Sequence, residues 1–116
     1  MDKKLQSALE FADYNKSITV QRQFLKEKLD SDLTYGYNGG IFKIDQTLIN
    51  FTQFLIDKNR VTDIPLIDVN KNPILINDIQ QFQNIILDRY FSAVNYYIDK
   101  IGDLKKARST VDLINL

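Results

Sequence analysis

The chain has 116 residues, no cysteine and no histidine, and its 15 basic and 15 acidic side chains give a formal net charge of zero. This length fits one domain with a core of ordinary size, and the balanced charge argues against a protein that holds nucleic acid or an anionic membrane by bulk electrostatics. The missing residue types exclude nucleophiles activated by histidine, zinc sites built from histidine and cysteine, and haem ligation by histidine.

Two features of the sequence predict a soluble, intracellular protein without a membrane partner. No stretch approaches the roughly 18 consecutive apolar residues that a membrane-spanning helix needs. The N-terminus, Met1 to Lys4 followed by an amphipathic run, lacks the continuous apolar core of a signal peptide.

Residues 2 to 33 are helical in pattern, but their apolar positions do not form one stripe. The short face that includes Leu5 does not merge with the face that includes Ile18, and Phe24 falls outside the latter. A break around Asn15 to Ser17 reconciles the two faces, because Asn and Ser favour caps and turns over helix interiors. We therefore predict two helices, at about residues 3–14 and 18–32.

Tyr35 to Ile44 carries the clearest local signal for strands. Asn38 and Gly39 supply the two positive-φ residues of a type I′ turn between aromatic flanks, so the stretch predicts a β-hairpin. The alternative for this glycine-rich stretch is a phosphate-binding loop, but neither the P-loop pattern nor a GxGxxG that opens a helix is present. Asp45 then caps a helix that is expected to end at about Asn59.

Ile64 to Ile76 contains two short apolar strands around a turn rich in Asp, Asn and Pro. Asp68, Asn70 and Asn72 occupy the first, third and fifth positions of an EF-hand calcium loop, which is the alternative interpretation. The sixth position is proline instead of glycine, and the twelfth is isoleucine instead of the bidentate glutamate. Bonding of Asp and Asn side chains to the backbone explains the turn without an ion, so we favour a second hairpin.

The stretch from Asn77 to Arg108 predicts one long helix. Two rows of apolar residues follow it at steps of three and four and together cover roughly half of its circumference. Asn77 is the expected N-cap, and Gln80 completes a capping box. Because a surface helix needs a narrower apolar stripe, we expect this helix to pack on two sides, against its own domain or another subunit.

The end of the long helix depends on how Gly102 is interpreted. It is either the residue just past the C-cap or a glycine inside the helix. An unbroken helix over this stretch is about 48 Å long, whereas a compact domain of this size is roughly 35 Å across. The helix is therefore expected to stop near Gly102 or to project beyond its domain. Its last turns are the best candidate for an interface.

Residues 109–116 form an apolar terminus that opens with a Ser109–Asp112 pair suited to one more helical turn. Such a terminus folds back onto its domain or docks in a groove on a partner. A small basic patch precedes it, where positive charge complements the helix dipole, and consists of Lys105, Lys106 and Arg108. The candidate partner interface comprises Tyr90, Phe91, Val94, Tyr97, Ile98, Ile101, Leu113, Ile114 and Leu116.

Acid–base and metal chemistry would depend on 13 Asp and two Glu. Asp99 and Asp103 lie one helical turn apart and could share a divalent cation, but a solvent-facing strip explains them more simply. We therefore predict a protein that is not an enzyme, with no catalytic residues, no cofactor, no metal and no small-molecule substrate.

Four stretches carry a resemblance to a known group of proteins: SALEFADYNKSITVQ, YNGGIFKIDQTLINFTQFLI, PLIDVNKNPILINDIQQFQ and a tyrosine-rich helix ending in KKARS. In this order they resemble small uncharacterised proteins of T4-like phages of marine bacteria, over most of the chain. The resemblance implies a phage context, which agrees with a composition rich in residues coded by AT-rich codons. It contains no motif of known chemistry and transfers no catalytic or binding residue.

The expected fold is α+β, helix-dominated, with two N-terminal helices, two short hairpins, a middle helix and a long C-terminal helix. Residues 1–108 are expected to form a single domain and 109–116 an apolar tail. The favoured function is a structural or interaction protein, a phage virion or assembly component that self-associates or docks on a protein partner. The alternative is a small phage regulator that binds a host protein or nucleic acid. The expected location is the cytoplasm of an infected bacterium or the virion.

Overall fold

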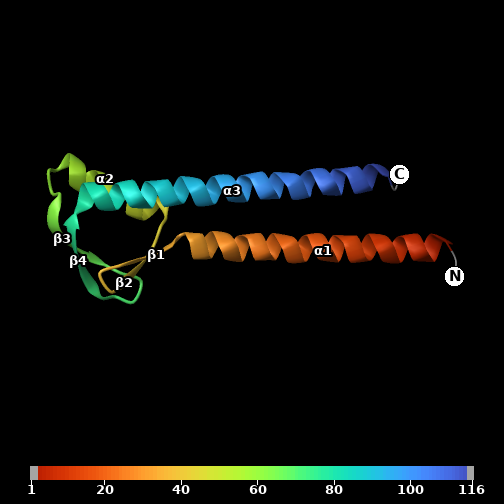
Figure 1. Cartoon of the computed structure of the whole chain (residues 1–116), viewed down its shortest axis with the longest axis horizontal. Helices are drawn as coiled ribbons and strands as arrows, with labels where there is room; N and C mark the ends of the chain where they lie inside the picture. Colours follow the sequence, from red (N-terminus) through yellow and green to blue (C-terminus); the bar gives the residue numbers. More distant parts are fainter. Residues whose placement is uncertain (1–2, 115–116) are drawn as a thin grey trace. The chain divides into compact units, whose positions relative to one another are not determined.

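The fold of the chain, in a computed structural model, is helix-rich α+β, as the sequence predicts (Figure 1). The structure describes residues 3–114, and the side chains of 11, 14 and 108–114 lie outside the description. In chain order the elements are α1 (Lys3–Asp32), β1 (Thr34–Tyr37), β2 (Gly40–Lys43), α2 (Gln46–Asp57), β3 (Thr62–Ile67), β4 (Pro73–Asp78) and α3 (Ile79–Ile114).

The N-terminal segment is one helix, α1, and the prediction of two helices with a break was wrong. α1 contains no glycine or proline, so no residue in it forces the backbone out of the helix. Asn15 stays inside the helix, and its carbonyl oxygen also accepts a bond from the Thr19 hydroxyl at 3.0 Å. The reluctance of Asn and Ser to occupy a helix interior is only a fraction of a kcal/mol per residue, roughly 0.5, which is too little to end a helix.

Both predicted hairpins are present, as two separate two-stranded antiparallel sheets. In the first, Tyr37 pairs with Gly40 around Asn38 (φ 47°) and Gly39 (φ 79°), the positive-φ turn that the sequence predicts. In the second, β3 pairs with β4 from Thr62 opposite Asp78 to Ile67 opposite Pro73. A side chain at Gly40 would collide with that of Ile74 on β4, so the first hairpin has glycine where the second approaches it.

Side-chain caps set the starts of α2 and α3. Asp45 accepts the backbone N–H of Leu48 at 2.8 Å, which confirms it as the N-cap of α2. At α3 the cap is Asp78, which accepts the N–H of Gln81 at 3.1 Å, so the prediction of Asn77 as the cap was wrong. Asn77 lies in β4, whose pairing with β3 extends through Asp78 and delays the helix by one residue.

Contacts within the chain group it into two compact units, residues 1–28 with 96–116 and residues 29–95. We call them the helical unit and the mixed unit. The core of the mixed unit draws on both hairpins, on α2 and on the first turns of α3. Its buried residues are Tyr35, Phe42, Ile44, Leu55, Leu66, Ile74, Ile76, Ile79, Phe82 and Ile86.

The helix α3 has 36 residues and passes through Gly102 without interruption, so it does not stop there. At 1.5 Å per residue it is about 54 Å long. Residues 109–114, expected to be a separate tail, continue the same helix. Leu113 and Ile114 therefore have helical backbone, but their side chains, and all of Leu116, lie outside the described residues.

Gly102 offers a direct test of the continuous helix. A Cβ added at this position would have no neighbour within 4 Å, so alanine fits without strain. We expect Gly102→Ala to stabilise the protein by about 1 kcal/mol, because glycine is that much worse than alanine in a helix interior. Urea unfolding followed by circular dichroism should show a higher midpoint at an unchanged slope. An unchanged or lower midpoint would contradict a helical Gly102, and Gly40→Ala, which collides with Ile74, should lower the midpoint in the same assay.

Candidate interaction surface

The predicted interface residues of α3 divide between two sides of the helix. Phe91 and Ile98 are 56% and 62% exposed. Tyr90 lies on the other side, half-buried against the core of the mixed unit, and accepts a 3.5 Å hydrogen bond from the Gln46 amide. Tyr90 therefore packs against the core of its own unit. Its ring still meets the Phe91 ring edge-on, with centroids 5.5 Å apart.

A row of five apolar side chains on α3, which we call the α3 stripe, lies outside the buried core of the mixed unit. Its members recur at steps of four, three, four and three, so helical geometry alone puts them on one side of α3. Phe91 and Ile98 are exposed, and the other three are half-buried. The members are Leu87, Phe91, Val94, Ile98 and Ile101.

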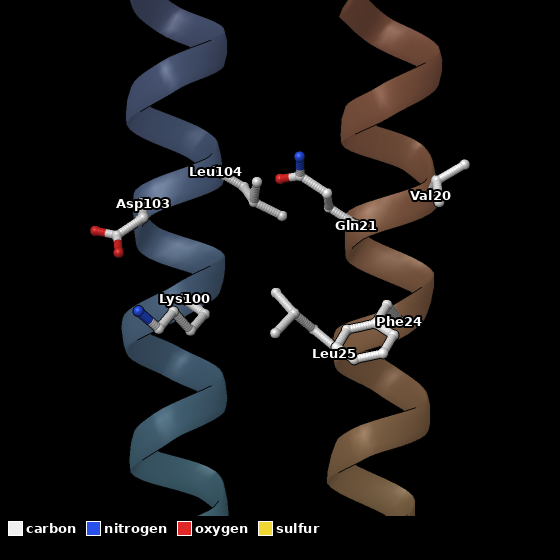
Figure 2. Close-up of a pocket in the computed structure, with 7 residues that line it drawn as sticks. All are labelled: Val20, Gln21, Phe24, Leu25, Lys100, Asp103 and Leu104. Atoms are coloured by element: carbon white, nitrogen blue, oxygen red, sulfur yellow. The ribbon is translucent and has the colours of Figure 1, made fainter.

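The helical unit has a second apolar feature, a groove of about 500 Å³ between α1 and the C-terminal half of α3 (Figure 2). Figure 2 shows Leu25 and Leu104 pointing toward each other across the two helices. Val20 and Phe24 line the groove from α1 and remain 61% and 63% exposed. The groove is completed by Gln21, Lys100 and Asp103.

Two lysines beside this groove contact one aromatic ring. The ammonium groups of Lys28 and Lys100 lie 5.1 and 5.6 Å from the centroid of the Tyr96 ring, within cation–π range. No pattern in the sequence predicts this cluster, because Lys28 and Tyr96 meet only when α1 and α3 are paired. Of the predicted basic patch, Lys105 and Lys106 are exposed, and the side chain of Arg108 lies outside the described residues.

In the mixed unit, Asp68 occupies the position that an EF-hand would use for calcium, but its carboxylate is bound by the backbone. One oxygen, Oδ2, accepts the N–H of Ile41 at 3.0 Å, and the other, Oδ1, accepts those of Asn70 and Asn72 at 3.0 and 2.8 Å. The bond from Ile41, and after it that from Asn72, lowers the pKa of the Asp68 carboxyl, against an opposing effect of burial. The carboxylate thus joins the turn after β3 to strand β2.

The described residues hold no group of three or more His, Cys, Asp or Glu side chains placed to share a metal ion. Asp99 and Asp103 are both exposed on α3, as expected for a solvent-facing strip. A cavity of about 460 Å³ lies beside Asp68 in the mixed unit, between α2 and strands β2 and β3, and its lining is mainly apolar.

The chain is therefore a helix-rich α+β protein, and its main surface features, the α3 stripe and the groove of the helical unit, are apolar. Within residues 3–114, no helix is long and apolar enough to cross a membrane. Comparisons with protein-family models, curated proteins and solved structures find no match to the chain.

Proposed function

We propose that this protein is a non-enzymatic interaction protein that docks on another protein chain through the exposed side of α3. The observation that carries the proposal is the exposure of Phe91 and Ile98 on the α3 stripe. Burying a side chain of this size fully is worth roughly 1.5–3 kcal/mol, so leaving two in water forgoes a large stabilisation unless a partner covers them. Contiguous exposed apolar residues commonly mark protein interaction sites.

The helical unit supports the same conclusion from its own composition. Among its described side chains only Ile18 and Leu25 are buried apolar residues, while Val20 and Phe24 remain exposed. Units this small seldom bury enough apolar surface alone, and association is one common remedy. A place in a phage virion or its assembly is part of the proposal and depends on the resemblance and composition described above.

The test uses a matched pair of charge insertions on α3. Ile98→Glu puts a carboxylate into the α3 stripe, whereas Ser92→Glu puts the same charge on an exposed position away from it. We expect the tagged wild-type protein, isolated from its native source, to form a stoichiometric complex with itself or another protein. Ile98→Glu should abolish that complex and Ser92→Glu should keep it. A wild-type protein that is a strict monomer without a stoichiometric partner would refute the proposal.

A further inference from the structure

We propose that the mixed unit binds an extended peptide segment of another protein, which adds as a strand to the outer edge of β3. The site is the cavity of about 460 Å³ between α2 and strands β2 and β3. Every residue that lines this cavity belongs to the mixed unit, so the site lies within one compact unit. It is a different surface from the α3 stripe, and the proposal does not depend on the function proposed above.

The pairing of the first hairpin decides which backbone groups of β2 face away from it. The N–H of Ile41 donates to the Asp68 carboxylate, and its C=O accepts the Val69 N–H at 2.9 Å, so both groups point away from β1. Backbone direction alternates along each strand of an antiparallel pair. Lys43, two residues after Ile41, therefore also directs its N–H and C=O away from β1. The outer edge of β2 is joined to the chain after β3 at Ile41 and is open at Lys43.

The outer edge of β3 is open in the same way. The Asp68 N–H donates to the Asn72 C=O at 3.0 Å, which marks a hydrogen-bonded pair of the second hairpin. The adjacent Ile67 is therefore in a non-hydrogen-bonded pair, and its N–H and C=O point away from β4, as does the C=O of Pro65. Among the described residues, no hydrogen bond takes up the N–H or C=O of Ile67 or Lys43.

The open edge of β3 is short and has defined ends. At one end, the Val69 N–H is already bound to β2, and at the other, Asp63 has a φ of 53° and no partner in the register with β4. Because Pro65 has no N–H, the edge between them offers its C=O and the N–H and C=O of Ile67. Proline on an edge strand also limits uncontrolled pairing with other strands. The edge is thus suited to one short strand.

The cavity beside this edge determines which side chains the peptide carries. Its lining includes the buried Phe42 and Leu66 and the exposed Phe51, Ile67 and Val69. Successive side chains of a strand point to opposite faces, so a strand added here turns every second side chain toward this apolar lining. The volume lies within the range of roughly 300–1,000 Å³ that is usual for ligand pockets. The occupant is therefore an extended segment with apolar residues at alternate positions.

The open backbone groups distinguish a peptide strand from other apolar occupants. A lipid chain has no backbone groups to offer, and a helix uses its own N–H and C=O groups internally. An added strand supplies both the main-chain hydrogen bonds and the side chains. The two carboxylates of the lining, those of Asp45 and Asp68, already accept backbone N–H groups from Leu48 and Ile41, so they do not require a cation.

Hydrogen exchange followed by NMR on the full chain tests the site directly. The probe is the blocked peptide Lys-Thr-Val-Thr-Val-Thr-Lys, whose alternate valines supply the apolar face. With the peptide at ten times its dissociation constant, exchange of the Ile67 amide should slow about tenfold. The amide of Leu75, on the outer edge of β4, should exchange at an unchanged rate. No binding at millimolar peptide, or no slowing at Ile67, would overturn the proposal.

A matched pair of proline variants tests the contribution of the edge. Ile67→Pro removes an N–H from the outer edge of β3, and Leu75→Pro removes one from the outer edge of β4. Neither N–H bonds across the hairpin, so both variants should keep the fold, which thermal unfolding checks. We expect the affinity for the peptide to fall about tenfold in Ile67→Pro and to stay unchanged in Leu75→Pro. Equal affinities in wild type and Ile67→Pro would contradict strand addition at β3.

Two further outcomes would also overturn the proposal. Protection of the Ile67 amide that rises with protein concentration, without peptide, would show that the open edge pairs with a second copy of this chain. Ile98→Glu, the variant that tests the α3 stripe, should leave peptide binding unchanged because Ile98 does not line the cavity. Loss of peptide binding in that variant would place the peptide elsewhere. The proposal and the function proposed for α3 therefore fail separately.

Discussion

Replacing Phe82 with alanine is expected to destabilise the mixed unit by about 3–5 kcal/mol, a large share of the stability of an ordinary domain. Phe82 is only 1% exposed, and its ring centroid lies 5.4 to 5.8 Å from those of Phe42, Tyr37 and Tyr35. These three rings come from one hairpin, so the truncation removes the aromatic side chain of α3 that contacts all three of them. Thermal unfolding followed by near-ultraviolet circular dichroism of the tyrosines measures the loss.

The matched control for Phe82 is Phe54, which has the same side chain on an exposed face of α2. Phe54→Ala removes a partial stack on Phe51, with centroids 6.5 Å apart, and the ring that lies 5.8 Å from the Lys58 ammonium, and it should cost less than about 1 kcal/mol. Equal losses in the two variants would show that the aromatic cluster around Phe82 does not hold the mixed unit together.

Asp68→Asn is expected to weaken the contact between the two hairpins and lower the melting temperature by about 5 °C or more. The asparagine carbonyl can still accept the N–H groups of Asn70 and Asn72, but its amide then points a donor at the Ile41 N–H. Asp68→Ala, which leaves all three donors without the carboxylate, should lower the melting temperature further. Asp63→Asn is the control, because Asp63 is exposed and its φ of 53° suits asparagine equally well.

The same carboxylate predicts a specific loss of stability in acid. The pKa of Asp68 is lower in the folded chain than in the unfolded one, so the unfolded chain binds more protons between the two values. The stabilisation is therefore complete above the unfolded-state pKa of about 4 and is lost as the pH falls through the lower folded pKa. The difference in unfolding free energy between wild type and Asp68→Asn should shrink over this range. A difference that is constant with pH would contradict the charged contact.

Local chemistry made several parts of the fold predictable from the sequence. The turn at Asn38 and Gly39 and the cap at Asp45 each depend on residues within a few positions, and both predictions were confirmed. The break predicted near Asn15 was wrong because intrinsic helix preferences are weak. The start of α3 was misplaced by one residue because the pairing of Asp78 with Thr62, across the β3–β4 hairpin, decides where β4 ends.

The surface features that depend on tertiary pairing were harder to predict. The α3 stripe is visible as a period in the sequence, but only burial separates exposed Phe91 from half-buried Tyr90. The groove beside Leu25 and Leu104 and the two lysines on Tyr96 join residues far apart in the chain. Single-sequence periodicity carries no information about which α1 face meets which α3 face.

The helical unit is discontinuous in sequence, and this connectivity constrains the order of folding. Its first half, in α1, leaves the ribosome before residues 29–95 and has no helical partner until residue 96 onward is made. An isolated helix is marginal in water, so α1 should be only transiently formed during that interval. Folding of residues 29–95 shortens the effective loop between the two halves and lowers the entropy cost of bringing them together. Nascent chains stalled before residue 96 should therefore leave α1 open to proteases.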